Sequence, residues 1–393
     1  MTSPLEWLFW LSFATVLYTY FLYPLLIAAL NRLRPARSAT STATAPRMVS
    51  IIIPVHNEEA HLPRRLDELT RMMQASGIRG EIIVVSDAST DRSVEIARSF
   101  ADRGVRVLEM PTKQGKAAAL TAGASAAQHE LLVFADARQR WADDALSQLV
   151  SNFADPAIGA VSGDLVLESA PGVLAGVGLY WRFEKWLRKQ ESRWGAQVGV
   201  TGAICAVRKS LFRAIPPGTL LDDVYWPMLV ALEGSRVIHD ERAVAFDRLP
   251  ENPRDEFRRK VRTLAGNFQL LTLLPGAALL PWRNRVWWQW VSRKLMRLVV
   301  PWALIAMLVA SFFLADDLYE MSFYGALFRL QVIGYTIGLL GVLPGLSRIR
   351  LFGVGASFLT LNAAAWLAFW VWITGRAGTS WHKVQYQPAA EET

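Results

Sequence analysis

The sequence contains almost no cysteine and lacks two common phosphate-binding signatures. Cys205 is the only cysteine in 393 residues, which excludes an intrachain disulfide and a zinc site built from several cysteines. A single thiol fits a reducing compartment. No Gly-x-Gly-x-x-Gly follows the first predicted strand and no P-loop is present, so the sequence supports neither a dinucleotide fingerprint nor a Walker-type ATP site.

Apolar residues and basic residues are both abundant. Hydrophobic residues make up 52% of the chain, and the mean hydropathy of +0.22 is too high for an ordinary soluble domain. Lys and Arg number 42 against 34 Asp and Glu, a net charge of +8. Such an excess suits nucleic acid, anionic lipid or a phosphorylated substrate, and its position in the chain decides among them.

A long uncharged segment begins the chain. Residues 7–30 are long enough to span a bilayer. A cleaved signal peptide would have a basic start and a shorter apolar run, whereas Glu6 and many aromatic residues occur here. We therefore predict a retained membrane helix over residues 1–30 and a linker over residues 31–46. Arginines that follow the helix place this end in the cytoplasm.

The C-terminal third is apolar again. Three further membrane helices are predicted within residues 298–375, at 298–314, 324–343 and 354–374. The acidic loop 315–320 is expected outside and the basic loop 347–350 in the cytoplasm. That arrangement puts the basic tail, residues 376–393, outside, against the same rule. A re-entrant or interfacial final helix is the alternative.

Tryptophan alternates with arginine and lysine in residues 276–297, just before a predicted membrane helix. Interleaved aromatic and cationic residues also occur in proteins that bind single-stranded nucleic acid. Beside a membrane span, an interfacial amphipathic helix is the better interpretation. A similar stretch at residues 181–194 is expected to hold the soluble part against the cytoplasmic leaflet. The basic excess thus indicates membrane lipids rather than nucleic acid.

Residues 47–275 alternate short apolar strands with helical patterns. Strands are predicted at 49–55, 81–87, 105–110 and 130–136, with helices at 59–74 and 91–101. This alternation predicts an α/β domain with a mostly parallel sheet. Ligands bind beyond the C-terminal ends of the strands in such sheets.

Polar residues follow three of these strands. They are His56, Asn57 and Glu58 after the first, Asp87 after the second and Asp136 after the fourth. Capping of a helix explains Thr90 or Asp91 alone. It does not explain carboxylates at several strand ends, which suit a nucleotide and a divalent cation.

Four motifs in order resemble family 2 glycosyltransferases. They are residues 49–59, 85–91, 115–120 and 134–136, and the layout is similar to the membrane-embedded hyaluronan, cellulose and poly-N-acetylglucosamine synthases. The resemblance implies a GT-A fold, a nucleotide-diphosphate sugar donor, with a UDP-sugar favoured, and Mg²⁺ or Mn²⁺ as cofactor. It assigns donor-binding roles to Pro54, His56, Asn57, Glu58, Asp87, Lys116, Asp136 and Arg262, and the metal to Asp136.

The metal motif departs from the family pattern. Arg138 stands where the resemblance places a second acid. One carboxylate is enough if the donor's phosphates and water supply the other ligands, as Mg²⁺ tolerates. We therefore expect weak metal binding without donor, and expect Arg138 to contact phosphate or to pair with a nearby acid.

The resemblance also supplies an acceptor side and a catalytic base. Thr201 and Gly202 lie in a loop that is similar to the family's acceptor loop, although an ordinary turn into a strand fits equally well. Asp222 and Asp223 match a Glu-Asp pair whose final acid is the base, so Asp223 would deprotonate the acceptor. A pair of helix-capping acids is the alternative.

The last motif also differs. Residues 259–263 align with Gln-x-x-Arg-Trp, with Arg262 at the arginine and Thr263 at the tryptophan. Arginine binds phosphate oxygens in bidentate fashion. Thr263 cannot stack on a sugar, which favours addition of one or a few sugars.

The sequence therefore predicts an inverting glycosyltransferase in a bacterial-type inner membrane, with a cytosolic catalytic domain. It would move a sugar to a lipid-linked or saccharide acceptor in polysaccharide or glycolipid biosynthesis. Two alternatives stay open: a processive polysaccharide synthase, and a catalytically inactive scaffold that binds nucleotide or glycan.

Overall fold

The computed structural model describes residues 3–33, 45–168, 175–248, 253–315, 322–343 and 345–376. Most of the predicted linker, the acidic loop from residue 316 and the tail from residue 377 lie outside these ranges. The side chain of Trp181 also lies outside them.

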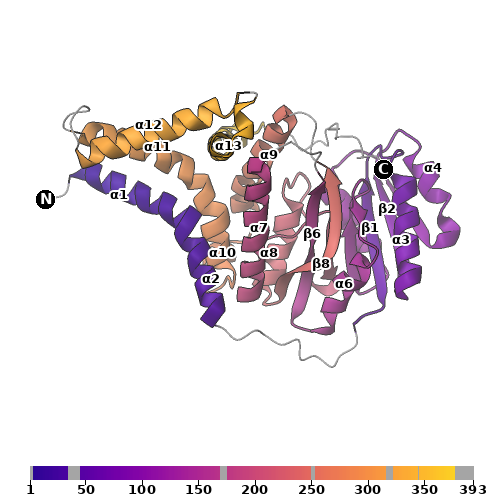
Figure 1. The fold of residues 1–393 in the computed structure, drawn as a ribbon. Helices are drawn as coiled ribbons and strands as arrows, with labels where there is room; N and C mark the ends of the chain where they lie inside the picture. The colour runs from indigo at the N-terminus through magenta and orange to yellow at the C-terminus, as the bar shows by residue number, and fades with distance from the viewer. Residues whose placement is uncertain are drawn as a thin grey trace.

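An eight-stranded sheet forms the centre of the protein (Figure 1), with the strand order β3-β2-β1-β4-β7-β6-β8-β5. The first four strands in that order are parallel, and β7 and β5 run antiparallel to their neighbours. The strands are β1 (Met48–Val55), β2 (Arg79–Asp87), β3 (Val105–Met110), β4 (Leu131–Ala135), β5 (Arg140–Trp141), β6 (Ile158–Glu168), β7 (Ile204–Arg208) and β8 (Arg236–Arg248).

Helices cover both faces of the sheet, because the central strands are apolar on both sides. Alternate residues of β1 enter two different cores: Ile51 and Ile53 pack with α3 and α6, whereas Ile52 packs with α5 and α8. The mostly parallel α/β sheet predicted from the sequence is confirmed. The helices are α3 (Leu62–Ser76), α4 (Ser93–Arg98), α5 (Lys116–Ala126), α6 (Ala145–Ser151), α7 (Ala175–Trp194), α8 (Asp222–Leu232) and α9 (Pro253–Leu273).

Within the described residues, four helices are long and apolar enough to cross a membrane: residues 4–33, 287–314, 323–340 and 350–373. The first contains α1 (Pro4–Leu17) and α2 (Tyr23–Leu33) around a π-helical turn. The second contains α10 (Trp287–Trp290), a π-helical turn at Val291–Leu295 and α11 (Met296–Leu314). The others are α12 (Phe323–Leu340) and α13 (Arg350–Ile373). Residues 287–297, expected in a separate interfacial helix, therefore continue directly into a candidate membrane span.

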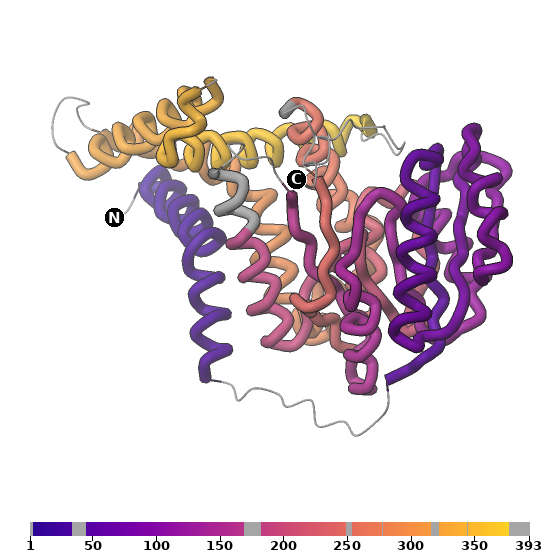
Figure 2. Tube along the Cα trace, turned by 45° about the vertical axis from the view of Figure 1, so that its right-hand side comes forward, coloured from indigo at the N-terminus to yellow at the C-terminus, as the bar shows by residue number. Residues whose placement is uncertain are grey.

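The two longest of these helices each have one half beside the sheet domain and one half away from it. In Figures 1 and 2, α1, α11 and α12 lie together at a distance from the sheet, whereas α2 and α10 run alongside α7. Tyr23 and Ile27 of α2 are buried against Leu187 of α7. Asn31 Nδ2 donates to the Gln190 carbonyl oxygen at 2.7 Å. The helix α7 therefore joins the sheet domain to the apolar helices.

A buried network of charges fixes this junction. Arg293 forms ion pairs with Glu184 (2.8 Å) and with Glu191, and Arg297 forms a second pair with Glu184. The Tyr23 hydroxyl donates to Glu191 Oε1 at 2.7 Å. Burial alone would raise the pKa of Glu184, but Arg297 and Arg293 hold it well below its usual value. Each buried charge is thus compensated by a partner from another helix.

We expect Glu184→Gln to destabilise the protein by about 3–5 kcal/mol, because it removes the buried charge that Arg293 and Arg297 share. Thermal unfolding of the full chain in detergent measures this loss. Lys189→Gln is the matched control, since Lys189 is on the same helix but half-exposed. Equal melting temperatures of the two variants would contradict the stabilising role of the network.

Candidate active site

The ends of β1 and β2 form two interlocked turns. Asn57 and Ala88 both have positive φ, at 58° and 52°, which is uncommon for residues other than glycine. The Asn57 side chain accepts a hydrogen bond from the Thr90 backbone N–H at 2.8 Å, and Ser93 Oγ accepts one from the Glu58 N–H at 2.8 Å. Strained backbone at strand ends is often associated with a functional site.

Asp87 holds the turn that leads to Lys116. Its two carboxylate oxygens accept backbone N–H groups of Gln114 (2.6 Å) and Gly115 (2.8 Å), and the side chain is fully buried. His56 Nδ1 lies 2.8 Å from the Asp87 carbonyl oxygen, and His56 Nε2 lies 3.0 Å from Lys113 Nζ. Asp87 therefore positions the neighbouring turn, and its contact with the base or ribose stays a prediction.

Lys116 forms an ion pair with Asp136 and interacts electrostatically with Asp222 and Asp223. Lys116 begins α5 and places Nζ 2.6 Å from Asp136 Oδ1 at the end of β4. Burial would lower the pKa of Lys116, but the charges of Asp136, Asp222 and Asp223 raise it above its usual value. Three carboxylates thus act on the ammonium group of Lys116.

The predicted catalytic pair lies in the first turn of α8. Asp222 is the first residue of this helix and Leu221 precedes it, so neither acid occupies the capping position. Burial is the main cause that raises the pKa of Asp222 to about 6. Repulsion from Asp223 and Asp136 also raises this pKa, whereas attraction to Lys116 lowers it. Burial also raises the pKa of Asp223, against the attraction of nearby cations. A raised pKa makes a carboxylate a stronger base near neutral pH.

The loop with Thr201 and Gly202 lies directly beside this pair. The Val200 N–H donates to the Asp223 carbonyl oxygen at 2.8 Å. A Cβ atom on Gly202 would lie 3.4 Å from Lys116 Nζ and 3.7 Å from Asp223 Cβ. Gly202 thus leaves space between the two charged side chains where a larger residue would intrude.

We expect Gly202→Val to fold normally but to reduce sugar transfer by about tenfold or more, because its methyl groups enter the space between Lys116 and Asp223. Steady-state kinetics with donor and acceptor measure the effect. Gly195→Val is the control, since nothing lies within 4 Å of a Cβ there. Unchanged transfer by the Gly202 variant would show that this space is not used.

Asp136 is the residue that could bind a divalent cation at this site. Asp136 Oδ1 accepts from Lys116, and Oδ2 makes no hydrogen bond to the described residues. The side chain is 29% exposed, so a ligand can reach it. No three potential ligands cluster within the described ranges. Asp136 therefore fits a cation whose other ligands come from a bound diphosphate and water.

Arg138 pairs with an acid of its own sheet. It makes a two-pronged ion pair with Asp247 of β8, with one distance of 2.9 Å, and Gln139 Nε2 donates to the same carboxylate at 3.1 Å. Of the two contacts expected for Arg138, the structure thus shows the acidic partner.

Arg262 is not brought into contact with the other predicted residues. Its side chain is exposed on α9, and no hydrogen bond or ion pair joins it to any described residue. It lies one helical turn before Gly266, where a Cβ atom would meet Leu221 at 2.6 Å. Gln269 on the same face accepts a hydrogen bond from the Leu220 N–H at 2.9 Å. The helix α9 therefore supports the segment that leads to Asp222.

Two cations near Asp222 and Asp223 were not predicted from the sequence as site residues. Arg188 and Lys294 both act electrostatically on Asp223. Arg188 comes from α7 and Lys294 from the start of a candidate membrane helix. Both belong to Trp- and Arg-rich stretches that indicate a membrane surface, so the sequence offered no signal that separates them from their neighbours.

The sheet order and the covering helices define a GT-A fold, as the sequence resemblance implied. A mannosyltransferase from Pyrobaculum calidifontis, solved in complex with GDP-Man and Mn²⁺, has this fold; it superposes with a TM-score of 0.68 at 22% identity, over 94% of this chain and 99% of that one. Residues 50–215 match the sequence model of Glycosyl transferase family 2. The chain therefore contains a Glycosyl transferase family 2 domain.

Curated relatives match parts of the chain. A poly-beta-1,6-N-acetyl-D-glucosamine synthase of Staphylococcus epidermidis is 22% identical over 57% of this chain and 55% of its own length. A dolichyl-phosphate beta-glucosyltransferase of Drosophila melanogaster is 37% identical over 23% of this chain and 30% of its own length. The chain spans about half or less of the length of these relatives.

Proposed function

We propose that this protein is a membrane-bound inverting glycosyltransferase that moves a sugar from a nucleotide-diphosphate sugar to a lipid-linked or saccharide acceptor. The observation that carries the proposal is the grouping of Asp136, Lys116 and Asp223 around the space that Gly202 leaves open. The position of the apolar helices beside α7 supports action at a membrane. The arginines that follow the first apolar helix in the sequence favour a cytosolic sheet domain.

The reaction requires one group that accepts a proton and positive charge that stabilises the leaving diphosphate. Asp223 takes the proton of an acceptor hydroxyl while that oxygen attacks the anomeric carbon of the donor. The bond between the anomeric carbon and the diphosphate oxygen breaks on the opposite side, so the configuration inverts and a nucleoside diphosphate leaves. Lys116 offsets negative charge on the leaving group. A divalent cation at Asp136 would neutralise the diphosphate further.

The first experiment identifies the sugar donor. The full chain in detergent is incubated with a panel of UDP- and GDP-sugars, with Mn²⁺, Mg²⁺ or EDTA, and release of free nucleotide is measured. The resemblance favours a UDP-sugar, whereas the mannosyltransferase neighbour was solved with GDP-Man. We expect metal-dependent release from one donor class. Release from no donor, together with nucleotide binding, would favour the inactive scaffold.

A processive synthase is the second candidate, because the match to the poly-N-acetylglucosamine synthase covers 57% of this chain. Against it, the exposed residue on α9 at the stacking position is Thr263, which has no ring. Sizing the product separates the two candidates: short products support single addition, and a long polymer from enzyme and donor alone supports the synthase.

A further inference from the structure

The helix that carries Asp222 and Asp223 begins without a side-chain cap. Leu221 occupies the capping position of α8, and its apolar side chain cannot accept a hydrogen bond from the first turn. Both acids lie in that first turn. The direction in which their carboxylates point therefore depends on what holds the residues just before the helix.

Gln269 of α9 holds this preceding segment with both ends of its side-chain amide. Its Oε1 atom accepts a hydrogen bond from the Leu220 N–H, and its Nε2 atom donates to the Gly218 carbonyl oxygen, both at 2.9 Å. A backbone N–H can only donate and a carbonyl can only accept, so these partners fix the orientation of the amide. Gly218 has φ 78°, a conformation that glycine adopts without strain. One side chain thus satisfies two backbone groups of a single turn.

Apolar contact holds the same segment against α9. A Cβ atom on Gly266 would lie 2.6 Å from Leu221 Cγ and 3.1 Å from Leu220 Cβ, so a larger residue there would push the segment away. Leu220 and Leu221 are both buried. Close packing and two hydrogen bonds therefore fix the chain directly before Asp222.

The helix α9 is itself packed against a candidate membrane span. Phe268, the neighbour of Gln269, lies in one buried cluster with Ala364 and Ala368 of α13. Its ring stacks on that of Trp372, with the centroids 5.4 Å apart. These contacts restrict movement of α9, so Gln269 projects from a rigid element.

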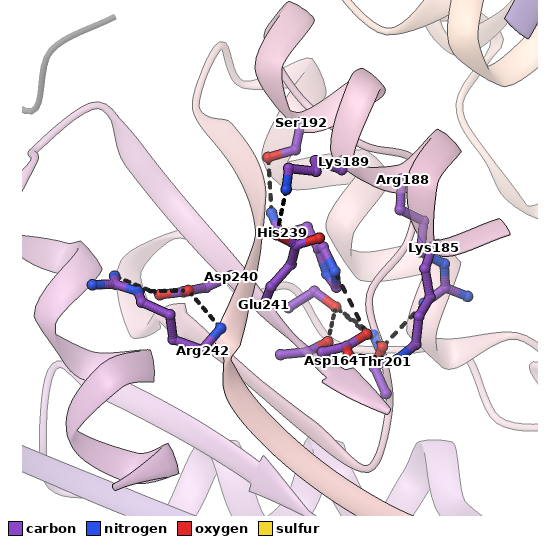
Figure 3. Close-up of polar contacts among 12 residues, drawn as sticks. Asp164, Lys185, Arg188, Lys189, Ser192, Thr201, His239, Asp240, Glu241 and Arg242 are labelled. Atoms are coloured by element: carbon purple, nitrogen blue, oxygen red, sulfur yellow. Dashed lines mark hydrogen bonds and ion pairs between the residues drawn. The ribbon is translucent and has the colours of Figure 1, made fainter. Parts of the chain in front are cut away.

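The backbone of Asp223 is also held by the acceptor-side loop. The Val200 N–H donates to the Asp223 carbonyl oxygen at 2.8 Å. The next residue, Thr201, accepts a hydrogen bond from Arg188 Nη1 at 3.0 Å (Figure 3), and its N–H donates to Ser162 Oγ at 2.9 Å. This loop does not involve Gln269, so removing the Gln269 contacts should alter the segment before Asp222 and leave the loop in place.

We propose that Gln269 is a positioning residue for Asp223: it fixes residues 218–220 against α9 and thereby sets where the Asp223 carboxylate lies. This inference rests on the proposed function, in which Asp223 is the base. A base that must meet an acceptor hydroxyl tolerates little displacement, since a misplacement of about 1 Å costs about 10²-fold in rate. Gln269 acts through the backbone and needs no contact with either substrate.

Gln269→Met in the full chain in detergent tests the proposal. Methionine has nearly the same length and helix propensity as glutamine, but it cannot replace either hydrogen bond. We expect kcat for sugar transfer to fall about tenfold to a hundredfold while KM for the donor changes less than about twofold, because the donor half keeps its contacts. Amide hydrogen exchange should become faster in residues 218–223, a readout that needs no substrate.

A double-substitution cycle shows whether the loss passes through Asp223. In the Asp223→Asn chain, Gln269→Met should lower transfer by less than about a further twofold, because the base that it positions is already absent. Gln74→Met is the matched control, since Gln74 is exposed on α3. This control should leave both transfer and hydrogen exchange unchanged.

Three results would overturn the positioning role: unchanged kcat in Gln269→Met, a changed donor KM with unchanged kcat, or an equal loss with and without the Asp223 carboxylate. Melting temperature verifies that each variant is folded. Gln269→Asn, whose amide is one methylene shorter, repeats the measurements if the methionine variant does not fold. Full transfer by Asp223→Asn overturns the proposed function itself, whereas loss in that variant with unchanged kcat in Gln269→Met overturns this inference alone.

Discussion

Replacing Asp223 by Asn is expected to reduce sugar transfer by about 10²–10⁴-fold, the usual contribution of a general base. An amide has nearly the same shape as the carboxylate but cannot accept the proton of the acceptor hydroxyl. Nucleotide binding should persist, because Lys116 and Asp136 keep their ion pair. Transfer of labelled sugar under single-turnover conditions measures the chemical step directly.

The acid Asp143 supplies the control, since Asp143→Asn makes the same chemical change on an exposed side chain. In the unaltered protein, transfer should also fall as the pH is lowered, and at a higher pH than for an ordinary aspartate, because burial raises the pKa of Asp223. Full transfer by Asp223→Asn would refute the proposed mechanism and would return attention to the scaffold alternative.

Replacing Asp136 by Ala is expected to cause the second large loss, about 10²–10³-fold in metal-dependent transfer, since a bound cation stabilises the leaving diphosphate by several kcal/mol. The substitution also removes the partner of Lys116. Binding of Mn²⁺ reports the role without depending on activity: the unaltered chain should bind it weakly alone and more tightly with UDP or GDP.

For this prediction Asp143→Ala is the matched control. The Asp136 variant should lose the metal-dependent part of nucleotide binding and keep the metal-independent part. If it keeps full metal-dependent transfer, the cation is held elsewhere. Tight Mn²⁺ binding to the unaltered chain without nucleotide would contradict the single-carboxylate site, which depends on phosphate oxygens for its other ligands.

Much of the sheet domain could be predicted from local pattern. The apolar run of β1 is buried on both faces, and such runs separated by amphipathic helices are typical of parallel sheets. The carboxyl ends of parallel strands meet at one edge, so the sequence predicts that His56, Asp87 and Asp136 lie close together. The continuous helix over residues 287–314 was harder to predict from the sequence. Its first turns carry charged residues that are typical of a surface segment, and these turns are buried only by packing against α7.

The contacts of individual side chains could not be predicted from the local sequence pattern. Arg138 lies two residues after Asp136, yet it pairs with Asp247, which is more than a hundred residues away. Arg262 was expected near the diphosphate, but it is exposed without a described partner, and its helix instead supports the segment before Asp222. Spacing in the chain predicts which residues share an element, and it does not predict which elements face each other.

The amino-acid sequence alone was sufficient for the α/β class, the GT-A resemblance, the four apolar helices and the acids at the strand ends. These features depend on periodicity, burial and order along the chain, which are local properties. The tertiary structure decided the charge environment of Asp223. Lys116, Arg188 and Lys294 come from three separate helices, and Gly202 leaves room between Lys116 and Asp223. Electrostatic interactions depend on distance in space and on burial, and only the packed chain sets both.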